Sequence, residues 1–108
     1  MDWIYQAEVI SIYDGDTITV DIDMGMKVWQ RRVHVRLAGI NAPEMIGITK
    51  PQGTISRDAL RILLPIGSQV KIVSHQFEKY GRLLATVYTD QEINVNQYML
   101  NNSFAIPM

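Results

Sequence analysis

The order of strand and helix patterns along this chain constrains its fold most strongly. Residues 17–23 alternate strictly, with Ile18, Val20 and Ile22 on one face and polar side chains on the other, which is typical of a half-buried β-strand. Four further segments have the β-branched and aromatic composition of strands: 7–13, 28–40, 70–74 and 83–88. The sequence therefore predicts five strands.

Two segments show helical signals. Apolar residues recur at helical spacing over residues 55–64 and predict a helix. Thr49 and Gln52 have the spacing of a capping box just before it. Asn94 and Gln97 predict a short capped helix in the last part of the chain. The longer helix thus lies between the third and fourth predicted strands.

This order of elements is that of a five-stranded OB-fold barrel. We expect a mainly β fold with α (α+β), in which one helix joins strands three and four and a short helix follows the last strand. The 108 residues, of which 47% are hydrophobic and 19% charged, are typical of a globular chain. We expect residues 1–108 to form a single domain.

The composition restricts the kinds of site that the chain can build. It contains no cysteine, so a metal ion must be held by oxygen atoms or histidine. No signal peptide is visible at the N-terminus, and no apolar segment has the length of a membrane span. We expect an intracellular protein with no membrane partner.

The charge balance distinguishes between two classes of protein that act on nucleic acids. Ten Lys and Arg residues against eleven Asp and Glu residues give a net charge of −1. A domain that only grips a nucleic-acid backbone usually has a basic excess, because phosphate neutralisation supplies most of its affinity. A metalloenzyme that focuses charge in one cleft tolerates near-neutrality better.

Three short motifs place polar side chains at the ends of predicted strands, at residues 14–17, 41–44 and 79–82. Their carboxylates and amide are hard oxygen ligands for a cation. Arg36 and Arg82 carry planar guanidinium groups that match phosphate oxygens. Together these groups suit metal-assisted cleavage of a phosphodiester.

Each motif also has an ordinary structural interpretation. The segment 14–17 is a hairpin turn in most proteins, and Glu44 after Pro43 can be a solvated loop residue. In the functional interpretation, Asp16 binds a cation while Asp14 and Thr17 form hydrogen bonds around it. Glu44 then faces the same small volume, provided that strands two and three pair.

The remaining candidates differ in strength. His34 and His75 lie on predicted strands without metal-ligand spacing, and we interpret them as structural or surface residues. Tyr80 is close to Arg82 in the sequence, a position that suits contact with a base or a phosphate.

The motifs in their order resemble the staphylococcal nuclease (thermonuclease, micrococcal nuclease) family. The resemblance covers about residues 7–105 and includes D-G-D-T, R-L-x-G-I-x-A-P-E, K-Y-G-R-x-L-A and V-N-x-x-M-L. The short second strand, with D-I-D-M-G at 21–25, is similar to phage-type members. The resemblance implies a calcium-dependent (Ca²⁺) endonuclease that acts on DNA and RNA and leaves 3′-phosphates. We expect a monomer whose partner is single-stranded or locally open DNA or RNA.

The resemblance also implies roles for individual residues. Asp16 becomes a calcium ligand, and Glu44 becomes the general base or orients the attacking water. Asn96 matches a structural polar position in the last helix. The other assignments are transition-state stabilisation by Arg36 and Arg82, and nucleotide contact by Lys79 and Tyr80.

Two departures from the family pattern lower the expected activity. Asn41 stands where well-known members have an aspartate ligand, so we expect weaker calcium binding through an amide oxygen. The sequence also ends at Met108, without the family's further C-terminal helix. The alternative functions are a non-catalytic OB-fold nucleic-acid-binding domain and an interaction domain with inherited motifs.

Overall fold

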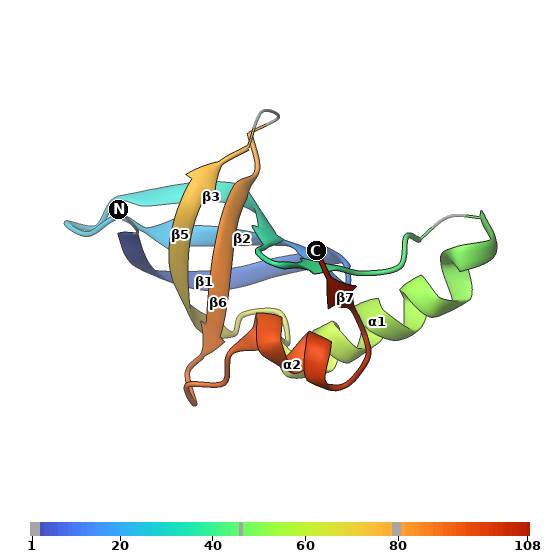
Figure 1. The fold of residues 1–108 in the computed structure, drawn as a ribbon. Helices are drawn as coiled ribbons and strands as arrows, with labels where there is room; N and C mark the ends of the chain where they lie inside the picture. The colour runs from blue at the N-terminus through green and yellow to red at the C-terminus, as the bar shows by residue number, and fades with distance from the viewer. Residues whose placement is uncertain (1–2, 46, 79–80) are drawn as a thin grey trace.

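The computed structural model describes residues 3–45, 47–78 and 81–108 and contains a closed barrel of five antiparallel and parallel strands (Figure 1). Neighbouring strands around the barrel follow the order β1-β2-β3-β6-β5. Only the contact between β3 and β6 is parallel among these pairs. The strands are β1 (Trp3–Asp14), β2 (Thr17–Asp23), β3 (Trp29–Leu37), β5 (Gln69–Phe77) and β6 (Leu83–Thr89).

Two helices accompany the barrel (Figure 1). A short 3₁₀ turn, η1 (Gly47–Thr49), leads into α1 (Lys50–Leu63), and α2 (Val95–Asn101) follows β6. The predicted five-stranded OB-fold barrel, with one helix between its third and fourth strands and a short C-terminal helix, is therefore confirmed. Within the described ranges, neither helix has the length and hydropathy needed to cross a membrane.

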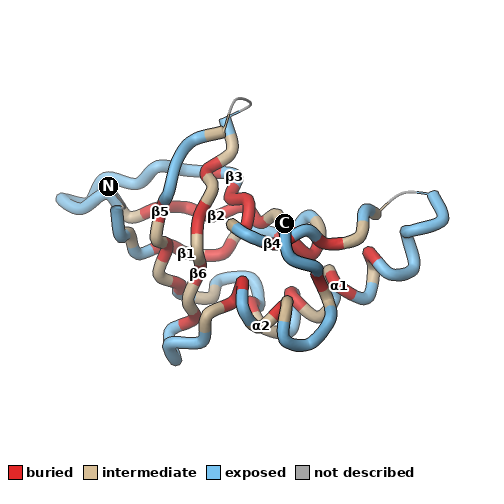
Figure 2. Tube along the Cα trace, viewed as in Figure 1, coloured by how far each residue is buried: buried red, intermediate tan, exposed pale blue. Residues whose placement is uncertain are grey.

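The apolar positions that alternate in the sequence form the barrel interior. Val9, Ile18, Val35, Ile72 and Val87 are fully buried, one from each barrel strand. Figure 2 shows the buried residues along the inner side of the barrel and on the sides of the helices that face it. Burial of these side chains supplies the main stabilising free energy of the fold.

The expectation of a half-buried β2 is wrong for the middle of that strand. The outward-facing Thr19 and Asp21 are each only 8% exposed. Side chains and backbone of β3 cover them: His34 lies against the Thr19 hydroxyl, and Arg31 pairs with Asp21. Polar residues on a predicted solvent face are thus buried by hydrogen-bonded partners from the neighbouring strand.

A bulge interrupts the predicted long third strand. Arg32 has a positive φ of 54°, and its backbone N–H donates to Oδ1 of Asp21 at 2.9 Å. The pairing register of β2 and β3 shifts between Val20 and Ile22 at this point. The strand also ends at Leu37 instead of residue 40, because Gly39 turns the chain with φ 78°.

The chain after this turn forms a small second sheet that the sequence analysis does not predict. The two-residue strand β4 (Ile40–Asn41) pairs with β7 (Ile106–Pro107) near the C-terminal end. Asn41 is opposite Ile106 in this pairing. The sheet therefore holds the segment before Glu44 in a defined position.

The two helix starts differ. The Asn94 side chain accepts a hydrogen bond from the backbone N–H of Gln97 at 3.0 Å, which confirms the predicted cap of α2. The capping box at Thr49 is wrong, since Thr49 makes no side-chain cap bond to α1. Thr49, the last residue of η1, already has helical backbone angles, and its hydroxyl donates to the carbonyl oxygen of Glu44 at 3.1 Å.

Asn96 connects α2 to the barrel. Its Oδ1 accepts from the backbone N–H of Val87 at 3.0 Å, and its Nδ2 donates to the carbonyl oxygens of Ala38 and Ala85 at 2.9 and 3.1 Å. The side chain is buried and three of its hydrogen-bonding positions are used. Asn96 thus holds together the helix, β6 and the turn after β3.

Candidate active site

A pocket of about 690 Å³ opens where the β1–β2 turn meets the end of β3, the segment after β4 and the start of β6. It brings together the sequence-predicted site residues of the described ranges: Asp14, Asp16, Thr17, Arg36, Asn41, Glu44 and Arg82. Lys79 and Tyr80, which were predicted to contact the nucleotide, lie outside the described residues. The pocket is also lined by Ser11, Ile12, Tyr13, Thr19, His34 and Ala42.

Asp16 is held rigidly in the β1–β2 turn. Its Oδ1 accepts from the hydroxyl of Thr17 at 3.0 Å, and its Oδ2 accepts from the backbone N–H of Ala42 at 2.9 Å. Its carbonyl oxygen accepts from the backbone N–H of Leu37 at 2.8 Å. These bonds join the turn to the end of β3 and to the segment after β4, so the carboxylate position is fixed before any ligand binds.

Asp14 is the second carboxylate of the turn. Its Oδ1 accepts from the backbone N–H of Asp16 at 3.0 Å, which is the local hydrogen bond of an Asx turn. Burial, and after it the nearby Asp16 carboxylate, together raise the pKa of Asp14 to about 6. The site therefore resists a second negative charge, and a bound cation would offset this repulsion.

Arg36 is buried, with 8% of its surface exposed, and is anchored at both ends of its guanidinium. Its Nη1 donates to the carbonyl oxygens of Leu37 and Ile40 at 3.0 and 2.9 Å. Its Nη2 lies 3.6 Å from Oδ2 of Asp16 and 3.4 Å from Oδ1 of Asn41. Arg36 thus fixes the turn after β3 while one of its nitrogens faces the polar pocket.

The loop that carries Glu44 is supported from behind by α1. A Cβ atom added to Gly53 would lie 2.4 Å from the carbonyl oxygen of Glu44, so the helix packs directly against this backbone. The Glu44 side chain itself is exposed at the pocket. Within the described ranges its carboxylate forms no ion pair or side-chain hydrogen bond, so it is available to a ligand.

Arg82 has a partner that the sequence analysis did not identify. Its Nε lies 3.3 Å from Oε1 of Glu78, and this buried oxygen has no hydrogen-bond partner otherwise. The pair spans the segment 79–81, and its i,i+4 spacing is a signal that could have been noticed. An ion pair through Nε orients the guanidinium and leaves its two terminal nitrogens for other acceptors.

His34 also lines the pocket, although the sequence analysis interpreted it as a structural or surface residue. It is exposed, and its Nδ1 lies 3.1 Å from the hydroxyl of Thr19. His34 precedes Arg36 by two residues on β3, so both side chains leave the strand on the same side. The Nε2 atom of His75, the other histidine, lies 2.8 Å from the hydroxyl oxygen of Thr86.

The donor set suits a hard cation held by few charges. Asp14, Asp16 and Asn41, whose side chains carry oxygen donors, line the same pocket. Across the part of the chain that the structure describes, no three His, Cys, Asp or Glu side chains gather as a metal cluster. Oxygen donors favour calcium or magnesium over zinc, and two carboxylates with one amide predict modest affinity.

Comparisons with known proteins agree with this geometry. The family model described as Staphylococcal nuclease homologue matches residues 34–107. The chain is 36% identical over 94 residues to an "Uncharacterized endonuclease" of Escherichia coli O157:H7, covering 87% of this chain and 55% of the relative. It is 33% identical over 103 residues to a "Micrococcal nuclease" of Shigella flexneri, covering 94% of this chain and 53% of the relative.

The chain thus spans about half the length of these curated relatives. The matched region contains Arg36, Asn41, Glu44 and Arg82, and it extends through both helices to the C-terminal strand. The resemblance seen in the motifs is therefore confirmed. This chain belongs to the staphylococcal nuclease homologue family.

Proposed function

We propose that this chain is a calcium-dependent nuclease that hydrolyses phosphodiester bonds in single-stranded or locally open DNA or RNA. The observation that carries this proposal is the convergence of Asp16, Arg36, Glu44 and Arg82 on one pocket. These four residues come from separate segments of the chain, and no feature of the barrel requires the exposed Glu44. The nuclease names of the relatives support the same activity.

Asp16 and Asn41 are the residues that would hold the calcium ion, with Asp14 beside them. When bound there, the ion supplies Lewis-acid polarisation of the phosphate and helps to position it. Asp16 contributes a carboxylate that the Thr17 hydroxyl and the Ala42 N–H already orient. Asn41 contributes an amide oxygen whose position is set by the pairing of β4 with β7.

The two arginines stabilise the phosphate as negative charge develops on its oxygens. Arg36 is anchored through Nη1 to two carbonyl oxygens, and Arg82 is anchored through Nε to Glu78. We assign the contacts with the non-bridging oxygens to Nη2 of Arg36, which also lies near Asp16 and Asn41, and to the two terminal nitrogens of Arg82. Because both groups are positioned before substrate binds, little reorganisation is needed in the transition state.

Glu44 accepts the proton of the attacking water. The new bond forms between the water oxygen and phosphorus, the bond from phosphorus to the 5′ oxygen breaks, and the leaving oxygen takes a proton from solvent. The products are a 3′-phosphate and a 5′-hydroxyl. General-base catalysis of this kind requires a carboxylate within reach of water, and the exposed Glu44 carboxylate at the pocket meets that requirement.

A non-catalytic nucleic-acid-binding domain is the second candidate, and the contacts of Arg36 favour it most. An arginine bonded to the carbonyl oxygens of Leu37 and Ile40 has a structural role even without chemistry. Such a domain has no need for an exposed glutamate supported by a glycine contact from α1.

Digestion of single-stranded DNA and RNA separates the two candidates. The nuclease should cut both in Ca²⁺ and stop in excess chelator, and its products should carry 3′-phosphates that a phosphatase removes. Binding without any cleavage in Ca²⁺ would assign the chain to the non-catalytic class. Cleavage that continues undiminished in chelator would contradict the metal dependence.

A further inference from the structure

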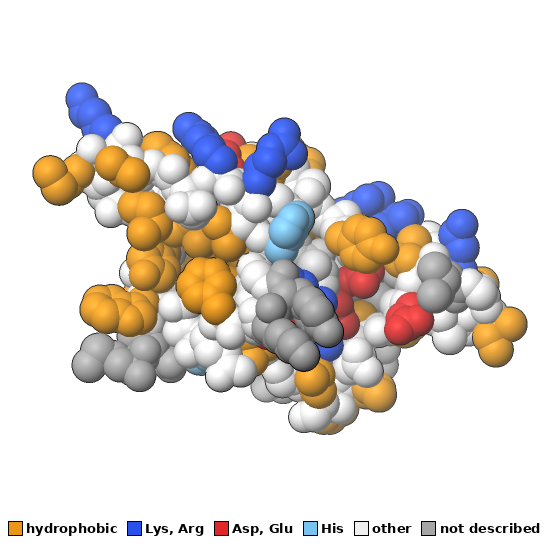
Figure 3. All heavy atoms as spheres, turned by 90° about the horizontal axis from the view of Figure 1, so that it is seen from above, with side chains coloured by type: hydrophobic (Ala, Val, Ile, Leu, Met, Phe, Trp, Pro, Cys, Tyr) orange, Lys and Arg blue, Asp and Glu red, His pale blue; other side chains and the backbone are white. Residues whose placement is uncertain are grey.

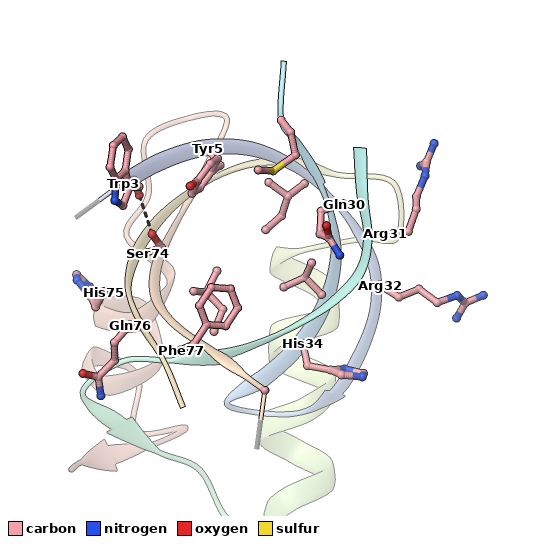
Figure 4. A pocket seen from close by; sticks show the side chains of 15 residues that line it. Trp3, Tyr5, Gln30, Arg31, Arg32, His34, Ser74, His75, Gln76 and Phe77 are labelled. Atoms are coloured by element: carbon pink, nitrogen blue, oxygen red, sulfur yellow. Dashed lines mark hydrogen bonds between the residues drawn. The ribbon is translucent and has the colours of Figure 1, made fainter. Parts of the chain in front are cut away.

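A second pocket, of about 620 Å³, opens at one end of the barrel (Figure 4). It is formed by the start of β1, the end of β2, the start of β3, the end of β5 and the start of β6. We call it the barrel mouth. None of the residues given a catalytic or metal-binding role above lines it. His34, which has no such role, lines both pockets.

Exposed aromatic side chains surround the barrel mouth. Trp3 is 60% and Phe77 is 72% exposed, and Tyr5 is half-buried. In Figure 4, Tyr5, Gln30 and Phe77 turn toward the opening, while Trp3 lies at the rim. Flat aromatic faces beside a polar amide suit a nucleobase, which stacks on the ring and forms hydrogen bonds at its edge.

The charge of the barrel mouth is complementary to phosphate. Its described lining residues include no carboxylate, although the whole chain has a net charge of −1. Arg31 is engaged, since it pairs with Asp21 at 2.8 Å and lies 5.2 Å from the ring centre of Trp29. The Arg32 guanidinium makes no hydrogen bond or ion pair to any described residue, and it extends outward from the rim in Figure 4.

This arrangement separates aromatic and cationic groups in space. Figure 3 shows hydrophobic side chains gathered at the barrel end of the molecule, and Lys and Arg side chains along one edge of the same face. A single strand of nucleic acid has the matching division, with bases on one side and phosphates on the other. A base can therefore enter the opening while the backbone passes the rim at Arg32.

The barrel mouth adjoins the candidate active site, since His34 lines both pockets. Arg82 lines the active-site pocket, whereas its neighbours Gly81 and Leu83 line the barrel mouth. His34, which lines both, is two residues from Arg36 on β3, or about 6.6 Å at a rise of about 3.3 Å per residue. A nucleic-acid strand that extends from the active site therefore reaches the barrel mouth within the roughly 4–16 nucleotides that one OB-fold binds.

We propose that the barrel mouth is a second subsite for single-stranded nucleic acid. A base several nucleotides from the cleaved bond stacks on Phe77 and Tyr5, and Arg32 contacts an adjacent phosphate. The proposal rests on the proposed function, because it extends the strand that the active-site pocket holds. It makes activity depend on substrate length, which the active-site residues alone do not require.

The first test compares an octathymidylate with a dithymidylate. The measured quantity is kcat/KM in Ca²⁺ for the octanucleotide, divided by kcat/KM for the dinucleotide. In the double variant Phe77→Ala, Arg32→Ala this ratio should fall by about tenfold, because one stacking contact has about that effect on binding. Ile62→Ala and Lys50→Ala, at exposed positions of α1, should retain the wild-type ratio. An unchanged ratio in the double variant, with cleavage intact, overturns the subsite and leaves the proposed function standing.

Binding in chelator keeps the two proposals distinguishable. The octathymidylate should bind the double variant about tenfold more weakly than the wild type. If the octathymidylate binds the wild type about tenfold more tightly than the double variant, but the wild type cleaves nothing in Ca²⁺, the subsite stands and the proposed function fails. If the wild type does not bind the octathymidylate, the subsite is wrong.

The fluorescence of Trp3 reports occupancy directly. The chain has two tryptophans, so Trp29→Phe leaves Trp3 as the single emitter. Octathymidylate should quench this emission and dithymidylate should not. A second copy of the chain is the competing occupant of the barrel mouth. The proposal would be overturned if Phe77→Ala abolished self-association of the chain and octathymidylate left the Trp3 emission unchanged.

Discussion

Arg36 places its Nη2 nitrogen 3.6 Å from Oδ2 of Asp16, across the contact between β3 and the β1–β2 turn. The pairing of Arg36 with Thr17 in the β2–β3 ladder produces this proximity. One side chain thus touches the residue assigned to the cation and lies in the pocket assigned to the phosphate. The same arginine also bonds two carbonyl oxygens, so its structural and chemical roles must be separated by experiment.

Arg36→Lys should affect stability and catalysis together. A lysine cannot donate to the carbonyl oxygens of Leu37 and Ile40 and also lie beside Asp16, so the melting temperature should fall. The maximal rate should fall by roughly 10²-fold, since a preorganised donor to the transition state is lost. Arg57→Lys, which changes an arginine beside Asp58 on α1, is the matched control. A lower melting temperature with an unchanged maximal rate would give Arg36 a structural role alone.

Gly53→Ala should lower activity although alanine favours helix formation. In an exposed helix interior the change stabilises by about 1 kcal/mol, but here the new Cβ would lie 2.4 Å from the Glu44 carbonyl oxygen. The loop must move, and Glu44 moves with it, so kcat should fall more than substrate affinity. Ile55→Ala, at an exposed position of the same helix, should have little effect on kcat. Full activity in Gly53→Ala would show that the position of the loop is not important.

Asn41→Asp tests the cation ligands. The substitution adds a negative oxygen donor at nearly constant shape, so calcium should bind more tightly and activity at limiting Ca²⁺ should rise. Without the ion, the added charge beside Asp16 should lower thermal stability. A calcium titration of the melting temperature for both proteins is the measurement, since an ion that binds the native state raises it. Superimposable titrations would show that position 41 does not contact the ion.

Asp21 should make stability depend on acid pH. The backbone N–H of Arg32 and the Arg31 guanidinium hold the pKa of Asp21 below its usual value of 3.8. The ionised carboxylate therefore stabilises the fold above the usual value, and this contribution is lost as the pH falls through the lowered pKa. Asp21→Asn should be less stable than the wild type at neutral pH, and the difference in unfolding free energy should shrink in acid. Asp90→Asn, at an exposed position, should show no such convergence.

Local patterns were sufficient to predict the barrel and several of the residues that line the candidate active-site pocket. The alternation around Ile18 and Val35 reports which face is buried, and the Asp14–Thr17 turn and Arg36 meet because strands two and three are joined by a short turn. The β4–β7 sheet was not predictable, because strands of two residues have no periodicity. The bulge at Arg32 depends on Asp21, which is distant in sequence and lies on the neighbouring strand.

The central claim is that one pocket both binds calcium and cleaves the phosphodiester bond through Glu44. The most direct measurement is a calcium titration of the wild type and Glu44→Gln, followed by melting temperature and by cleavage of single-stranded DNA, with Glu8→Gln as the control. We predict that calcium raises the melting temperature of all three proteins, and that Glu44→Gln alone cleaves roughly 10²-fold more slowly or worse. Cleavage by Glu44→Gln at the wild-type rate, with calcium bound, would contradict the account.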